Sequence, residues 1–216
     1  SNGQYYWNNA PSGGYTGYYS NPTASAVQAF EIHGHHEDQP DNPYAEAVGG
    51  GLDFLFGQLF VQNLSLQGGE DPDSNGNGIG LSVSGNRQIY ELGAVMDALV
   101  ASGTPDATAR TGPANVVGRR YQDIVQDMVD MYCWGQTDSG NAYGGWRYSW
   151  NSDSDNSAAQ WAAIGMAAAE RTPAHIGPGL DGILNTPDDV VVDYWGVVPQ
   201  WVKDRNKVWL DFSYNS

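Results

Sequence analysis

Residues 144–161 read Gly-Gly-Trp-Arg-Tyr-Ser-Trp-Asn-Ser-Asp-Ser-Asp-Asn-Ser-Ala-Ala-Gln-Trp and say more about the fold than any other stretch. A glycine–aromatic turn comes first, an acidic segment follows, and an alanine-rich apolar segment comes last. Asn156 and Ser157 are helix-capping residue types, so the pattern predicts a helix start. A weaker copy lies at residues 13–27. Repetition at a distance indicates a repeat architecture.

Three units follow from this repetition, with approximate bounds 1–65, 66–138 and 139–216, within one domain. Each unit has a loop rich in Gly, Asn and Asp, then a first helix, a connector and a second helix. We expect the first helices to start near Thr23, Gln88 and Ser157, at intervals of 65 and 69 residues. They are apolar around most of their circumference, which places them in the interior.

The second helix of each unit is amphipathic, with apolar residues at i, i+3, i+4 and i+7. Its stripes run over residues 48–60, 121–132 and 198–212. The middle helix is expected to expose its polar face, which carries Asp123, Gln126, Asp127 and Asp130. Evidence for strands is limited to the β-branched run at residues 190–192. The pattern therefore predicts an all-α fold of helical hairpins packed side by side.

The segments Gly-Gly-Trp-Arg-Tyr-Ser (144–149) and Asp-Ser-Asp-Asn-Ser-Ala-Ala-Gln-Trp-Ala-Ala-Ile (153–164) resemble the prenyltransferase and squalene-cyclase repeat. The resemblance is good over residues 143–170, weak over 13–34 and only topological elsewhere. It implies an α/α toroid in which the first helices are inner and the second helices outer. Three hairpins would form a partial toroid: an open arc, a fragment, or a subunit whose partner completes the ring.

The resemblance also places residues 153–156 where class II terpene cyclases carry an Asp-x-Asp-Asp acid, whose middle carboxyl protonates an alkene or epoxide. Asp155 would be this acid, with Asp153 beside it, held protonated in a dry pocket. Asn156 replaces the last Asp, which weakens the required charge pair. We favour the alternative interpretation, in which Asp155 and Ser157 cap an inner helix.

Prenyltransferase β-subunits in the same superfamily bind zinc through Asp, Cys and His. Asp130 and Cys133 are close in sequence, but no His follows them, and both lie on a predicted outer helix. Cys133 is therefore expected to be a buried apolar residue. Because it is the single cysteine of the chain, it also excludes an internal disulfide.

The loop at residues 71–80 carries the best ligand-binding signal. Its Asp-x-Asn-x-Asn-Gly pattern matches positions 1 to 6 of a calcium loop, in which alternate oxygens converge on the cation. The candidate calcium ligands are Asp71, Asp73, Asn75, Asn77 and Ile79. Ser84 stands where position 12 requires a bidentate Glu, and Glu70 or Asp71 could substitute. The alternative is a plain Asn-Gly turn.

A second acidic loop lies at residues 180–189 and resembles Asp-Gly-x-x-x-Thr-x-Asp-Asp calcium loops of secreted bacterial proteins. Its candidate ligands are Asp181, Asn185, Asp188 and Asp189. The alternative is a solvated acidic turn. Extracellular calcium is millimolar, so even a weak loop would be filled there.

Three of the four histidines are His33, His35 and His36, flanked by acidic residues. Imidazoles this close could chelate zinc, copper or nickel, although the spacing matches no defined site. The alternative is a favourable interaction of imidazolium with the carboxyl end of a helix.

Composition limits the partners. The net charge of −16 argues against nucleic acid or an anionic membrane surface. No apolar run reaches the roughly 18 residues of a membrane span. Few Lys and Arg and many Gly, Asn, Ser and Tyr suggest an extracellular or cell-surface location. The segment Asn63-Leu64-Ser65 is a glycosylation sequon, with chance occurrence as the favoured explanation.

Aromatic Gly-rich segments at residues 5–19 and 146–150 could stack on sugars, fill a subunit interface or plug gaps between hairpins. The first functional hypothesis is a secreted calcium-binding module with a structural or self-assembly role, as a homo-oligomer or with other chains. The second is an enzyme of the α/α-toroid class, terpene cyclase-like or acting on polysaccharide, with Asp155 as acid. The third is a carbohydrate-binding module.

Overall fold

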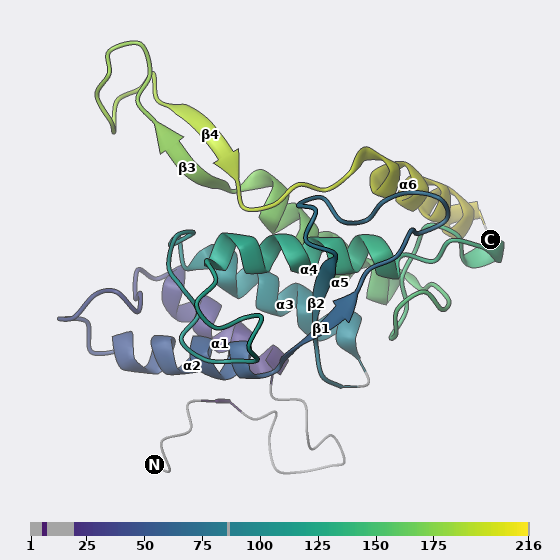
Figure 1. The fold of residues 1–216 in the computed structure, drawn as a ribbon, viewed down its shortest axis with the longest axis horizontal. Coiled ribbons are helices and arrows are strands. Elements are labelled where there is room, and N and C mark those ends of the chain that lie inside the picture. Colours follow the sequence, from purple (N-terminus) through teal and green to yellow (C-terminus); the bar gives the residue numbers. More distant parts are fainter. Residues whose placement is uncertain (1–5, 8–19, 86, 216) are drawn as a thin grey trace.

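We describe the protein from a computed structural model over residues 6–7, 20–85 and 87–215. The weaker motif copy at residues 13–19 and most of the N-terminal aromatic segment lie outside these residues. Figure 1 shows the order of the elements. They are α1 (Ser20–Glu31), α2 (Ala45–Gly57), β1 (Leu59–Asn63), β2 (Ile79–Val83), α3 (Gln88–Ala101), α4 (Tyr121–Gly135), the 3-10 helix η1 (Gly140–Ala142), α5 (Asn156–Arg171), β3 (Pro173–Gly177), β4 (Val190–Tyr194) and α6 (Gln200–Asn215).

The predicted all-α class, and with it the toroid, is wrong. The helices are accompanied by two antiparallel two-stranded sheets, β1–β2 and β3–β4, which make the fold a mixed α+β fold. The second predicted helix includes Leu59 and Phe60 in its stripe, whereas α2 ends at Gly57 and both residues lie in β1. There they face Val83 and Ser82 of β2, so a cross-strand ladder takes the backbone groups that a longer helix would have used.

The predicted helices form, and their starts near Thr23, Gln88 and Ser157 correspond to Ser20, Gln88 and Asn156. Helix α3 lies in the centre, with α1 and α5 packed against it and α4 covering it from another side. The α3–α5 contact is close because Gly93 and Gly165 lie at the crossing. A Cβ on Gly93 would collide with the Trp161 carbonyl oxygen of α5.

The Gly-Gly-Trp turn of the opening motif is fixed by packing against α6. Gly144 has a φ of +88°, and a Cβ there would overlap the Arg205 carbonyl of α6. The Trp146 side chain is buried, and its Nε1 donates to the Tyr132 carbonyl of α4 at 3.0 Å. The motif thus joins α4, α5 and α6, and Trp146 plugs the space between helices.

Hairpin β3–β4 projects from the helical body, as the green and yellow strands in Figure 1 show. The run at residues 190–192, the one stretch predicted as extended, forms β4. Its partner β3 was not predicted. Near its base, His175 of β3 lies between two carboxylates, 2.7 Å from Asp193 Oδ1 and 3.0 Å from Asp106 Oδ2.

Candidate functional site

The loop that joins β1 to β2 lies along α4. Figure 1 shows this loop in dark blue, above the teal helix α4. Asn75 and Asn77 donate from their side-chain amides to Asp127 Oδ1 of α4, at 2.7 and 2.8 Å. The Ser74 backbone N–H donates to Asp130 Oδ1 at 3.2 Å. The predicted calcium loop is therefore docked on two carboxylates of a neighbouring helix.

Within the loop, the Asp73 carboxylate organises the turn. Its Oδ1 accepts from the Gly76 and Asn77 N–H groups at 2.9 and 3.2 Å, and its Oδ2 accepts from Gly78 at 2.6 Å. Gly76 and Gly78 have φ values of +76° and +78°, which favour glycine. Asp71 accepts from the Asp73 N–H at 3.0 Å. The loop curls tightly around one carboxylate.

Asp127 and Asp130 have a relative exposure of 0%. Asp127 is compensated, because Arg119 pairs with its Oδ2 at 2.5 Å. Asp130 has no ion pair among the described residues. Its Oδ1 accepts from Gln126 and Ser74, but its Oδ2 is buried without a hydrogen-bond partner. Burial, opposed by these hydrogen bonds, raises the pKa of Asp130 to about 7.

The exposure predicted for this face of α4 is wrong at two positions. Asp127 and Asp130 were placed in solvent with Asp123 and Gln126, but the loop covers them. The sequence also lacks an acid at position 12 of the loop, and Glu70 and Asp71 are exposed. The carboxylates beside the loop come instead from α4, about fifty residues away in the sequence. The i, i+3 spacing of Asp127 and Asp130 places both carboxylates on one face of α4, and this spacing was the sequence signal that could have predicted their common site.

This arrangement can offer several oxygens to a hard cation. Calcium takes six to eight oxygens from carboxylates, amides, backbone carbonyls and water. Asp73, Asn75, Asn77, Asp127 and Asp130 are the side chains gathered here. Among the described residues, no three His, Cys, Asp or Glu side chains come together closely enough to hold a metal by themselves. Amide oxygens and water would therefore complete the set. Ile79 begins β2 and pairs with Asn63.

The second predicted calcium loop forms the tip of hairpin β3–β4. Asp188 accepts from the Asp181 N–H at 3.2 Å and from the Thr186 hydroxyl at 2.7 Å, and Asp189 accepts from the Asn185 N–H at 2.7 Å. The hydrogen bond from Thr186 lowers the pKa of Asp188. The predicted ligands share one compact turn, but these carboxylates use their oxygens to brace the turn and remain near solvent.

Asp155 lies at the N-cap of α5. Its Oδ1 accepts from the Ala158 N–H at 2.8 Å and from the Ser157 hydroxyl at 2.6 Å. Asp153 pairs with Arg147 at 2.5 Å and is exposed. These are the contacts expected of the capping interpretation.

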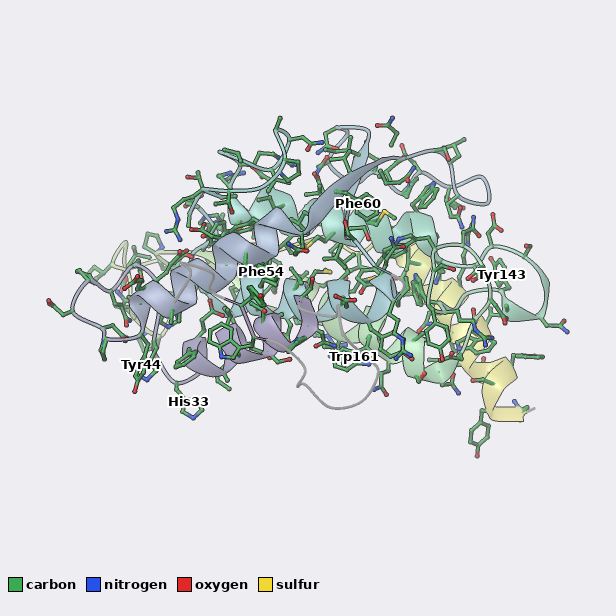
Figure 2. All side chains as sticks on the ribbon, turned by 90° about the horizontal axis from the view of Figure 1, so that it is seen from below. His33, Tyr44, Phe54, Phe60, Tyr143 and Trp161 are labelled. Atoms are coloured by element: carbon green, nitrogen blue, oxygen red, sulfur yellow. The ribbon has the colours of Figure 1, made fainter. Side chains whose placement is uncertain are left out.

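The three neighbouring histidines face different partners. His33 Nδ1 lies 2.8 Å from the Ala29 carbonyl of its own helix, and His35 stacks edge-on against Tyr44 with ring centroids 4.7 Å apart. His36 Nδ1 is buried without a hydrogen-bond partner. Figure 2 shows His33 and Tyr44 at one end of the molecule and Tyr143 at the other. The histidine metal site stays a prediction.

A second group of buried polar residues, which was not predicted from the sequence, surrounds Glu31 and Glu37. Glu37 accepts from the Tyr121 hydroxyl at 2.5 Å and pairs with Arg110 at 2.9 Å. Glu31, only 3% exposed, has two oxygens without a hydrogen-bond partner. Burial, assisted by the Glu37 charge, raises the pKa of Glu31 to about 9. Glu31 is therefore a neutral acid at pH 7.

Cys133 is buried in α4, where burial raises the pKa of its thiol well above the ordinary value. A thiol in this environment is a poor nucleophile and a poor metal ligand, because both roles need the thiolate.

Comparison of the chain with family models, with curated proteins and with solved structures gives no match in any of the three. The resemblance to the prenyltransferase and squalene-cyclase repeat therefore stays a prediction. Among the described residues, no helix combines the length and apolar character needed to cross a membrane.

Proposed function

We propose that the chain is a calcium-binding structural module that works outside the cell and associates with copies of itself or with other protein chains. The calcium site is the contact between the loop at residues 71–79 and helix α4. The cation joins the two by taking oxygens from both.

Asp130 Oδ2 is the observation that carries this proposal. A buried carboxylate oxygen without a partner is costly unless a cation or a donor satisfies it. The atom lies in the side chain that already holds the loop through Ser74. Asp73 and Asp71 add negative charge, and among the described residues Arg119 alone forms an ion pair with Asp127. A divalent cation would offset the remaining charge.

Composition supports the location outside the cell. The chain has 25 acidic and 9 basic residues, and the loop at residues 71–79 would be filled at the roughly millimolar calcium found there. Calcium binding to the folded state alone stabilises it by mass action. A module of this kind would keep its loops ordered outside the cell and lose that order when calcium is removed.

Isothermal titration of Ca²⁺ into the protein tests the site. We expect binding at or below about 1 mM, weakened roughly tenfold or more by Asp130→Asn and by Asp73→Asn. Asp123→Asn is the matched control, because Asp123 lies on the same helix but pairs with Arg120 in solvent. Asp189→Asn reports separately on the hairpin loop. Equal affinity in wild type, Asp130→Asn and Asp73→Asn would contradict the assigned site.

The alternative from the sequence, an enzyme with Asp155 as its acid, gains no support from the contacts of this residue. Its carboxylate accepts two hydrogen bonds at the start of α5, from the Ser157 hydroxyl and the Ala158 N–H, and both are contacts of a helix cap.

A further inference from the structure

The hairpin tip, residues 178–189, is an apolar and acidic surface held away from the helical body. Leu180 is fully exposed, and Ile183 and Leu184 are also exposed. Three carboxylates accompany them, Asp181, Asp188 and Asp189, and the tip contains no Lys or Arg. Exposed leucines at the end of a projecting hairpin indicate a contact surface, because nothing in the described fold covers them.

A groove between α5 and α6, the α5/α6 groove, has the complementary character. It has a volume of about 260 Å³, and its floor includes the buried side chains of Trp146, Met166 and Val202. Three cationic side chains line it, together with the carboxylate of Glu170: Arg171, Lys203 and Lys207.

The cationic character of this groove is unusual for a chain with a net charge of −16. The sequence contains two lysines, and both line the groove. Arg171 makes no ion pair with another described residue. Lys203 pairs with Glu170, and Lys207 lies 3.9 Å from Asp211 with both side chains well exposed. The Lys203–Glu170 pair is partly exposed and the Lys207–Asp211 pair is well exposed, and pairs of this kind are weak and leave the cations available to a second partner.

We propose that copies of this chain associate head to tail, with the hairpin tip of one copy docked in the α5/α6 groove of the next. This inference rests on the self-association in the proposed function and names its surfaces. The leucines of the tip cover the apolar floor, and the three carboxylates face the cations of the rim. Figure 1 shows the hairpin directed away from α6, so the tip does not occupy the groove of its own copy.

The contact is heterologous, since it joins two different surfaces. Each copy keeps a free tip at one end and a free groove at the other, so the assembly closes into a ring or grows as an open chain. Apolar burial supplies the affinity, while the opposite charges orient the copies and reduce the repulsion between two acidic molecules.

Sedimentation velocity over increasing protein concentration, in EDTA and in Ca²⁺, tests the inference. The mean mass of the wild type should rise with concentration, and Leu180→Asn or Lys207→Glu should weaken association about tenfold or more. Both side chains are exposed, so the fold should persist, as circular dichroism would verify. Ile32→Asn, at an exposed isoleucine after α1, is the matched control and should associate as the wild type does.

A charge exchange gives a second and independent test. Asp181→Lys with Asp189→Lys makes the tip basic, and Lys203→Glu with Lys207→Glu makes the groove acidic. Each double variant should be monomeric alone, because its tip and groove repel one another. An equimolar mixture should associate, because each tip then meets a groove of opposite charge.

Three results would overturn the inference: a wild type that stays monomeric at every concentration, a Leu180→Asn variant that associates like the wild type, or a mixture that stays monomeric. A monomer that calcium still stabilises refutes only the head-to-tail contact, whereas an oligomer without a calcium effect refutes only the calcium site.

Discussion

Two buried acids, Asp130 and Glu31, differ in what surrounds them. Asp130 lies beside a loop that supplies donors and further oxygens, so a cation can satisfy its free oxygen. Glu31 has no such loop, and the nearby Glu37 already uses Tyr121 and Arg110. The buried carboxyl of Glu31 is instead kept uncharged by protonation.

The protonation of Glu31 makes stability depend on pH. The unfolded chain releases this proton near pH 4.5 and the folded chain near pH 9, so unfolding releases a proton between these values. The stability contributed by neutral Glu31 is complete below pH 4.5 and declines as the pH rises toward 9. Glu31→Gln should therefore raise the melting temperature at pH 8 by roughly 10 °C, since pH 8 lies about 3.5 units above the pKa of the unfolded chain and each unit is about 1.4 kcal/mol.

Thermal unfolding of Glu31→Gln in EDTA at pH 5 and pH 8 measures this difference. At pH 5 the melting temperature of the variant should exceed that of the wild type by little. Glu70→Gln, which changes an exposed carboxyl, should melt like the wild type at both pH values. A gain of equal size at both pH values would show that Glu31 is ionised in the folded protein.

At the level of single residues, the contacts that could be predicted from the sequence are those between residues close together in the chain. The cap formed by Asp155 and Ser157 could be predicted because donor and acceptor lie within three residues. The burial of Asp127 and Asp130 could not, because the covering loop is about fifty residues away. An amphipathic pattern identifies the polar face of a helix but not what lies upon it.

At the level of elements, the helices were predictable and most strands were not. Periodicity over eleven or more residues identifies a helix, whereas each strand here has five residues. Leu59 and Phe60 continue the apolar spacing of α2, so their sequence fits either state. The pairing of β1 with the distant β2 decides between them, and this is tertiary information.

The α3–α5 crossing depends on the absence of a side chain at Gly93. Gly93→Ala should cost about 1–3 kcal/mol, because its Cβ would meet backbone of α5 that cannot move alone. Gly57→Ala is the matched control, since a Cβ there meets no atom within 4 Å. Urea unfolding should show the control to be neutral or stabilised by up to about 1 kcal/mol. Equal effects at both glycines would mean that α3 and α5 are not in close contact.

The base of hairpin β3–β4 depends on His175. A neutral imidazole donates from one nitrogen only, so contact with Asp193 and Asp106 favours the imidazolium. The hydrogen bonds that His175 donates, first to Asp193 and then to Asp106, raise its pKa above 6.5. The stabilisation is present below pH 6.5 and is lost as the pH rises through the raised value.

NMR titration of the His175 ring protons tests this anchor. The midpoint should lie above 6.5 in the wild type and should fall in Asp193→Asn and in Asp106→Asn. A His175 midpoint that neither substitution changes would contradict the paired geometry.

At the scale of the whole molecule, one hydrophobic core joins residues from α1 to α6, while the acidic segments lie outside it. The two loops with calcium-loop patterns are attached differently. Residues 71–79 lie against buried carboxylates of α4, and residues 180–189 form the tip of a projecting hairpin. We therefore propose that the first loop holds the structural cation and that the second makes the contact with another copy.

Thermal unfolding with Ca²⁺ and with EDTA, in wild type and Asp130→Asn, tests the calcium site most directly. The wild type should melt several degrees higher in Ca²⁺, since binding at 100 times Kd contributes about 2.7 kcal/mol. In EDTA, Asp130→Asn should equal or exceed the wild type, because it removes an uncompensated buried charge, and calcium should raise its melting temperature much less. A wild type that melts at the same temperature in Ca²⁺ and in EDTA would contradict the account.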